Sequence, residues 1–273
     1  MMKRRIKALY KRLKSNVRKP EMLILPGQLS FFFLMTIVPL AALVISIFSR
    51  FHINSAFIGD LIINNVPEAL IGIVDTLLNS ARANTNAIIF FISALVLASN
   101  GTHSMIIASN KIYNVKDNSY INRRLKSIVM MIVLICLLLF IFLVPVFGDM
   151  IIKMVQSINN NAFGDIVKLI YNILKYPISL GLVFIAIKLL YIMGPDIKIN
   201  SKEVDYGALF TSFSWVLVTQ AYSLYVENFS NYGNLYGSLS NILVLMWWVY
   251  LLAYIFVLGM GLNVTKYQLA KKE

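Results

Sequence analysis

Six long apolar runs, separated by polar or amphipathic stretches, dominate the pattern of hydrophobic and polar positions along this chain. No charged residue occurs between Glu227 and Lys266, around the last of these runs. About 20 helical residues are enough to cross the hydrocarbon core of a bilayer. The runs therefore predict six transmembrane helices, at about residues 23–49, 87–109, 127–147, 176–193, 206–226 and 239–262.

Amphipathic segments flank and connect these runs. Residues 1–20 are basic, with apolar side chains near helical spacing, which predicts an amphipathic helix at the membrane surface. Residues 53–82 and 149–170 predict further amphipathic helices in two extracytoplasmic connections. The expected fold class is an all-α integral membrane protein, with a six-helix membrane domain over 21–265 and a basic tail over 266–273.

Composition supports this class. Hydrophobic residues make up 59% of the chain and charged residues only 14%, whereas about 25% of a soluble domain is charged. The single cysteine, Cys136, lies inside an apolar run, so no intrachain disulfide is expected. The basic N-terminus lacks the apolar segment of a signal peptide, so we expect the first hydrophobic run to stay in the mature protein.

The net charge of +13 is unevenly distributed and predicts an orientation. Nine of the 25 Lys and Arg residues fall within the first 19 positions. Basic residues also gather in the connection between runs two and three, in the connection between runs four and five, and in the C-terminal tail. Because cytoplasmic segments carry an excess of Lys and Arg, this pattern predicts that both termini lie in the cytoplasm. Basic residues beside membrane spans also bind anionic headgroups. The expected partners are such lipids rather than a specific nucleic acid, with contacts from Lys3, Arg4, Arg5, Arg123 and Arg124.

Catalytic patterns are missing from the sequence. The two histidines, His52 and His103, belong to no zinc-binding pattern, and neither a P-loop nor a G-x-S-x-G motif occurs. The acidic residues are scattered, whereas a metal nuclease needs several carboxylates at one site. We therefore expect no enzyme activity, no cofactor and no metal site.

Polar residues inside the runs are the candidates for function. Asn100 and His103 share a face of the second run, and Gln220 and Glu227 share a face of the fifth. Polar groups at membrane depth face protein or water, so these four side chains are candidates to line a polar pathway. Hydrogen bonding between packed helices is the alternative, because it needs the same residue types. Pro39 predicts a kink in the first run.

A motif before the last run resembles a known family. It follows the pattern Y…F-x-x-Y-x-x-L-Y-G-S-L…W…G, with Tyr225, Phe229, Tyr232, Leu235, Tyr236, Gly237, Ser238, Leu239, Trp247 or Trp248, and Gly259. Weaker matches are residues 30–39, residues 110–113 with the pair Arg123–Arg124, and Tyr191 with Pro195. The chain thus resembles the YihY/BrkB family of bacterial inner-membrane proteins, once labelled ribonuclease BN.

The resemblance implies a six-helix protein of the bacterial cytoplasmic membrane. The family's nuclease label looks like a misassignment, and lipid or lipopolysaccharide-precursor transport and a virulence role have been suggested within it. The family often has an acid near the end of the last run, where this chain has Gly261. A coupling role for that acid is therefore not carried over to this chain.

Three functions follow as expectations, in order of preference. The first is a transporter or flippase-like factor for a lipid or other amphiphilic anionic substrate. The second is a non-transporting membrane scaffold or envelope-assembly factor, and the third, disfavoured, is a membrane nuclease. The turn with Tyr232, Tyr236 and Gly237 is either a gate or a tight aromatic turn. A homo-oligomer is compatible with the sequence.

Overall fold

A computed structural model of the chain describes residues 22–36, 87–137, 161–229 and 238–270. These residues form six α-helices and one 3-10 turn, and they contain no strand, which confirms the all-α class. The α-helices are Met22–Thr36, α5 (Ala87–Tyr113), 120–137, α7 (Asn161–Met193), α8 (Asp205–Phe229) and α10 (Ser238–Ala270); the 3-10 turn is η1 (Ser201–Glu203).

Two of these helices contain segments long and apolar enough to cross a membrane. They are Ile92–Tyr113 in α5 and Leu243–Gln268 in α10. Two shorter apolar helical segments, Met22–Thr36 and Pro177–Met193, belong to the first and fourth predicted runs. The remaining parts of the first and third runs lie outside the described residues, so the full count of six transmembrane helices stays a prediction.

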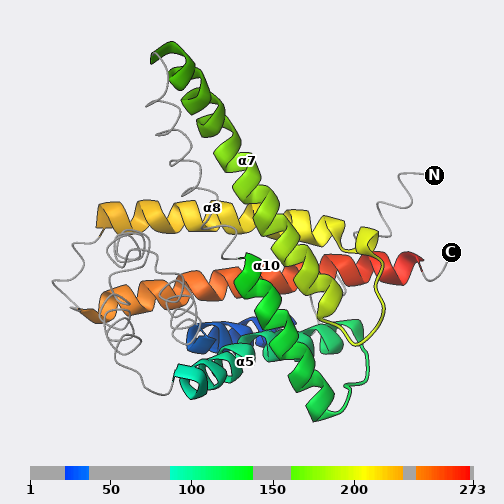
Figure 1. Ribbon diagram of the computed structural model, residues 1–273. Coiled ribbons are helices and arrows are strands. Elements are labelled where there is room, and N and C mark those ends of the chain that lie inside the picture. The colour runs from blue at the N-terminus through cyan, green and yellow to red at the C-terminus, as the bar shows by residue number, and fades with distance from the viewer. Residues whose placement is uncertain (1–21, 37–86, 138–160, 230–237, 271–273) are drawn as a thin grey trace.

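The antiparallel pair of α8 and α10 forms the long axis of the described structure (Figure 1). The two helices approach closely at Gly207 and Gly259, where a Cβ atom on either glycine would clash with the other helix. Gly207 N–H also donates a hydrogen bond of 2.9 Å to the side-chain oxygen of Asn263. Small residues at the crossing let the two backbones approach, as is usual for membrane helices.

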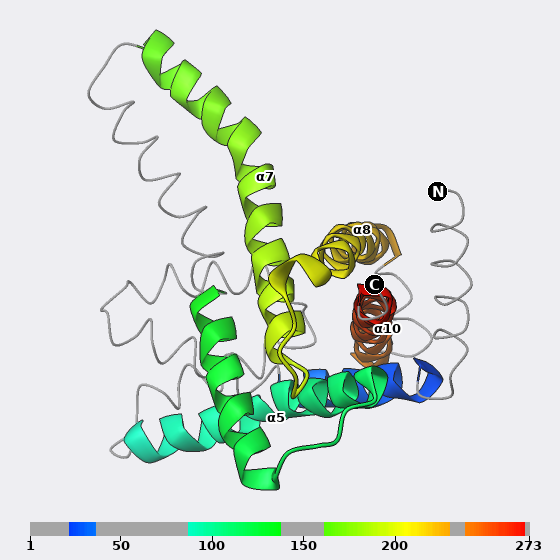
Figure 2. The same ribbon diagram turned by 90° about the vertical axis from the view of Figure 1, so that its right-hand side faces the viewer.

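Helix α7 crosses this pair, and α5 crosses beneath α10 (Figure 2). The buried hydroxyl of Tyr191 fixes the junction of α7, α8 and α10: it donates to the carbonyl oxygen of Phe256 at 2.8 Å and shares a 2.7 Å hydrogen bond with the hydroxyl of Thr211. The Tyr191 and Phe256 rings also pack together, with centroids 4.7 Å apart. The hydrophobic core extends from this junction to Leu29 and Ile106.

Candidate functional site

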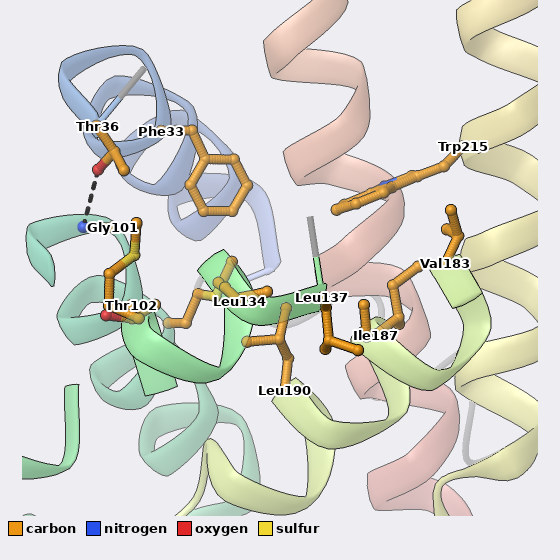
Figure 3. A pocket seen from close by; sticks show the side chains of 13 residues that line it. Phe33, Thr36, Gly101, Thr102, Leu134, Leu137, Val183, Ile187, Leu190 and Trp215 are labelled. Carbon is orange, nitrogen blue, oxygen red and sulfur yellow. Dashed lines mark hydrogen bonds between the residues drawn. The ribbon is translucent and has the colours of Figure 1, made fainter. Parts of the chain in front are cut away.

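An apolar cavity of about 280 Å³ lies among the helix Met22–Thr36, α5, the helix 120–137 and α7 (Figure 3). We call it the central cavity. It is not fully enclosed, and Trp215 of α8 borders one side. Its lining residues are Phe33, Thr36, Gly101, Thr102, Met105, Met131, Leu134, Leu137, Val183, Ala186, Ile187, Leu190 and Trp215.

The polar atoms at the cavity wall are engaged with the backbone. The hydroxyl of Thr36 donates to Phe32 O at 2.7 Å and accepts a 3.1 Å hydrogen bond from Gly101 N–H, drawn in Figure 3. The hydroxyl of Thr102 donates to Ser127 O at 2.8 Å. The cavity therefore presents hydrocarbon to its contents, and such cavities stay dry and bind apolar groups.

Helical spacing explains why these side chains converge. Val183, Ala186, Ile187 and Leu190 recur three and four residues apart and so share one face of α7. Trp215 closes the opposite side, and its indole N–H is held by Leu252 O of α10 at 2.9 Å. One wall of the cavity is thus held by a hydrogen bond to a third helix.

A cluster of polar side chains lies one helical turn beyond the cavity, at the end of the bundle that the charge pattern places in the cytoplasm. We call it the Asp196 cluster; its members are Asn110, Asp117, Asn118, Lys126 and Asp196. The carboxylate of Asp196 accepts hydrogen bonds from Lys126 Nζ at 2.7 Å, from Asn110 Nδ2 at 2.8 Å and from the Asn118 backbone at 3.3 Å. Its side chain is only 2% exposed.

The cluster joins four segments, three of them within residues 110–126 and the fourth 70 residues beyond Lys126. Asn110 Oδ1 accepts a hydrogen bond from the Asp196 backbone at 2.8 Å, and Asn110 Nδ2 also donates to Asp117 at 2.8 Å. Lys126 Nζ donates to the backbone oxygens of Gly194 and Pro195 at 3.0 and 2.9 Å. The end of α5, the following loop, the helix 120–137 and the α7–α8 connection are therefore tied together.

Local backbone geometry aims Asn110 at this cluster. Asn114 adopts a left-handed conformation with φ of 55°, which ends α5. Val115 N–H bonds Asn110 O at 2.9 Å and Asn114 N–H bonds Lys111 O at 3.2 Å, the pattern of a Schellman motif. The motif turns the chain back over the last turn of α5, so that the loop residues meet the Asn110 side chain.

Asp196 is held in its charged form. Burial by itself raises the pKa of this carboxyl group, but hydrogen bonds from Lys126, Asn110 and the Asn118 backbone outweigh it and leave the pKa of Asp196 below its usual value. The cluster therefore contains a partly buried ion pair between Asp196 and Lys126, and Lys126 Nζ lies within hydrogen-bond distance of three acceptors.

The two arginines predicted to contact headgroups have protein partners. Arg123 pairs with Asp117 at 2.7 Å. Arg124 donates to the side-chain oxygen of Asn100 and to Val96 O, both at 2.8 Å. Contact with lipid headgroups stays a prediction for Arg123 and Arg124. Lys3, Arg4 and Arg5 lie outside the described residues.

The structure does not bring the described pathway candidates to one place. Asn100 and His103 lie on α5 against the helix 120–137, where Asn100 accepts from Arg124 and His103 packs edge-on to Tyr120 with centroids 5.8 Å apart. Gln220 is exposed on the outer side of α8. The side chain of Glu227 lies outside the described residues. A pathway through all four stays a prediction, and the exposed position of Gln220 does not favour it.

Most of the aromatic turn motif falls outside the described residues. Tyr225 is part of α8 and is 40% exposed, and Ser238 begins α10. The side chains of Phe229 and Ser238 and the whole of Tyr232, Tyr236, Gly237 and Pro39 are not described. Whether the turn is a gate, and whether Pro39 kinks its helix, stay predictions.

Sequence analysis missed the members of the Asp196 cluster as functional candidates. Asn110 and Pro195 entered the sequence analysis only as weak family matches, and Asp196 did not enter it at all. Because Asp196 lies 70 to 86 residues from its partners, no spacing rule links it to them. The one available signal was that residues 110–113, the basic pair Arg123–Arg124 and Tyr191 with Pro195 all match one family.

Among the described residues, no group of three or more His, Cys, Asp and Glu is placed to hold a metal ion.

Comparison with known proteins agrees with the family resemblance. A family model described as Virulence factor BrkB matches residues 15–273. The ribonuclease-like protein YfkH of Bacillus subtilis is 28% identical over 241 residues, which cover 87% of each chain. A UPF0761 membrane protein of Vibrio parahaemolyticus is 28% identical over 262 residues, 92% of this chain and 80% of the relative. Another, of Photobacterium profundum, is 26% identical over 259 residues, 90% of this chain and 77% of the relative. No solved structure matches.

Proposed function

This chain belongs to the BrkB virulence factor family of membrane proteins, and we propose that it is a transporter or flippase-like factor for an amphiphilic, anionic lipid. The single observation that carries the proposal is the central cavity, an apolar space of about 280 Å³ among the helices. A scaffold built only to hold helices together has no use for such a space.

The size of the cavity suits part of a lipid chain. An apolar cavity of about 150 Å³ binds benzene, and small-molecule pockets begin at about 300 Å³. An empty apolar cavity costs on the order of 24 cal/mol per Å³ when it is fully enclosed, and less when it is partly open. An acyl chain entering the partly open space offsets that penalty, which supports a hydrocarbon occupant.

The surroundings of the cavity suit an anionic headgroup. Leu190 lines the cavity, and Gly194, four residues further on and directly after the end of α7, already accepts a hydrogen bond from Lys126 in the Asp196 cluster. Arg123 and Arg124 lie on the same helix as Lys126. A lipid with its chain in the cavity thus has its headgroup near this basic end, and anionic headgroups are attracted there.

Leaflet transfer of a labelled anionic phospholipid in reconstituted vesicles tests the proposal. Ala186→Phe fills the cavity from α7, so a lipid chain can no longer enter it. Transfer should slow by roughly tenfold or more, which corresponds to a free-energy change of about 1.4 kcal/mol or more. Ile185→Phe is the matched control, because the neighbouring Ile185 is 46% exposed on the outside of the same helix. It should leave the transfer rate nearly unchanged.

Two outcomes would overturn the proposal. No transfer across a broad panel of lipids would remove transport and favour the scaffold or envelope-assembly alternative. Equal transfer by both variants would remove the cavity from the mechanism. The nuclease alternative takes its name from relatives such as YfkH and has its own test: purified protein supplied with divalent metal should leave tRNA precursors intact.

A further inference from the structure

The outer face of α8 carries a regular apolar stripe with a polar residue in it. Phe213, Leu217 and Leu224 are 59%, 54% and 59% exposed. With Phe210 and Gln220 they follow one another at intervals of three, four, three and four residues. We call these five residues the α8 seam. This alternation is the spacing at which two helices pack along a left-handed crossing.

The seam points away from the packed core. The opposite side of α8 carries Gly207, Ala208, Thr211 and Ser212, and the last three are at most 2% exposed. Figure 2 shows α8 close to end-on, with α10 on one side and α7 on another. No described helix covers the seam, and its exposed side chains are therefore open to contact with lipid or with another protein.

Gln220 is the residue that lipid cannot satisfy. Its side chain is exposed, and it has no hydrogen-bond partner among the described residues. The neighbouring Thr219 meets the indole N–H of Trp248 at 3.4 Å, so Gln220 lies level with Trp248. That level is about 8 Å inside the apolar segment Leu243–Gln268 of α10, at 1.5 Å rise per residue. A carboxamide at this depth is costly unless another protein group bonds to it.

We propose that the α8 seam binds the α8 seam of a second copy of this chain, with the two Gln220 side chains bonded to each other. Two copies insert into the membrane in the same orientation, so a twofold axis along the membrane normal makes each seam residue face its own counterpart. A carboxamide is both donor and acceptor, so a second Gln220 is a complementary partner. A polar residue at one position of such a seam also fixes the register of a parallel helix pair.

Disulfide crosslinking of the full-length protein in its native membrane tests the geometry. In a Cys136→Ser chain, Phe213→Cys and Leu217→Cys should each give a crosslinked dimer on mild oxidation, because facing seam residues approach within reach of a disulfide. Ile185→Cys is the matched control: it is also exposed, and it lies as far along α7 from the α7–α8 connection as Phe213 lies along α8. It should give little dimer.

Fluorescence energy transfer between labelled copies in liposomes tests the role of the carboxamide. Gln220→Leu should weaken self-association by about three- to tenfold, as expected for loss of an interhelical hydrogen bond in a bilayer. Gln220→Asn keeps a donor and an acceptor and should weaken it less. The proposal would be overturned if the seam and the Ile185 control crosslinked equally, or if Gln220→Leu associated as strongly as the wild type. It would also be overturned if the seam crosslinked only to a different protein.

Discussion

The Asp196 cluster and the central cavity lie about one helical turn apart, yet they are built in opposite ways. In the cluster, the polar groups of Asp196, Lys126 and Asn110 bond to one another or to backbone from four segments. In the cavity, the wall is hydrocarbon and its two hydroxyl groups bond to backbone. In the first region these three side chains are fully hydrogen-bonded, and in the second region space is left unfilled.

This difference separates what holds the fold from what remains free to act. A fully bonded buried cluster has one arrangement, because moving any member leaves a charge or amide unpaired. An apolar cavity imposes no such geometry and accepts any hydrocarbon of suitable size. Substitutions in the two regions should therefore change stability by different amounts, and only a substitution that fills the cavity should raise it.

Removing the ammonium group of Lys126 should have the largest effect. Lys126→Met keeps the apolar stem but leaves the Asp196 carboxylate, 2% exposed, without its counter-charge. Breaking a fully buried ion pair from one side costs about 3–5 kcal/mol, and we expect the lower end of that range because the Lys126 side chain is 27% exposed. SDS-induced unfolding of the purified protein in mixed micelles measures this cost. Lys198→Met is the control, because Lys198 is an exposed lysine in the α7–α8 connection, two residues from Asp196. It should lower the free energy of unfolding only slightly, and similar losses for the two variants would contradict a structural role for the cluster.

Adding a methyl group to one glycine of each region should give an intermediate and unequal effect. A Cβ on Gly194, beside the cluster, would meet Ser109 Oγ at 2.5 Å and the backbone oxygen of Leu190 at 2.9 Å. A Cβ on Gly101, at the cavity, would meet the hydroxyl of Thr36 at 2.7 Å. We expect Gly194→Ala to cost about 2–3 kcal/mol and Gly101→Ala about 1 kcal/mol, because backbone yields less than a side chain.

The same unfolding measurement decides this pair. Gly181→Ala is the control, since nothing lies within 4 Å of its added Cβ. It should be neutral or slightly stabilising, because alanine is favoured over glycine inside a helix. Equal costs at Gly194 and Gly101 would mean that the cavity wall is as rigid as the cluster.

Filling the central cavity should raise stability rather than lower it. Ala186→Leu places three more carbons in the open space and should stabilise the protein by about 0.5–2 kcal/mol, the usual gain from filling a cavity. Ile185→Leu, on the outside of α7, should change stability by much less. If Ala186→Leu is instead destabilising, the space is smaller or more rigid than a volume of about 280 Å³ implies.

The apolar runs predicted the helices well but placed some of their ends too early. We expected the second run to end at 109 and the last at 262, whereas α5 continues to Tyr113 and α10 to Ala270. In both helices a polar residue looks like an end: Asn110 in α5 and Asn263 in α10. Both are only 1% exposed, because Asp196 and Gly207 supply their hydrogen-bond partners. A partner from a distant segment turns an apparent loop residue into a buried one.

The same reason explains which site features the sequence could predict. Polar residues inside apolar runs, such as Asn100 and Gln220, are visible by contrast with their neighbours. Lys126 and Asp196 lie among other charged residues at the predicted cytoplasmic end and look like ordinary topological signals. Only the tertiary structure shows that these two are bonded to each other. The central cavity is invisible in sequence, since its lining residues have the composition of any packed apolar helix.

Acid should weaken the cluster and leave the cavity unaffected, which is the smallest expected effect. The pKa of Asp196 is below its usual value in the folded protein. The charged carboxylate therefore stabilises the fold at every pH above its pKa in the unfolded chain, about 4, and this stabilisation is lost as the pH falls through the pKa in the folded protein. The stability advantage of the wild type over Asp196→Asn should therefore stay constant from about pH 7 to about pH 5 and shrink below about pH 4. Asp117→Asn, which alters a half-exposed carboxylate, should retain the acid-dependent loss, and Ala186→Leu should follow the wild-type profile. A wild-type advantage that grows in acid would mean that Asp196 is protonated in the folded protein and that Lys126 is held by the backbone oxygens of Gly194 and Pro195 alone.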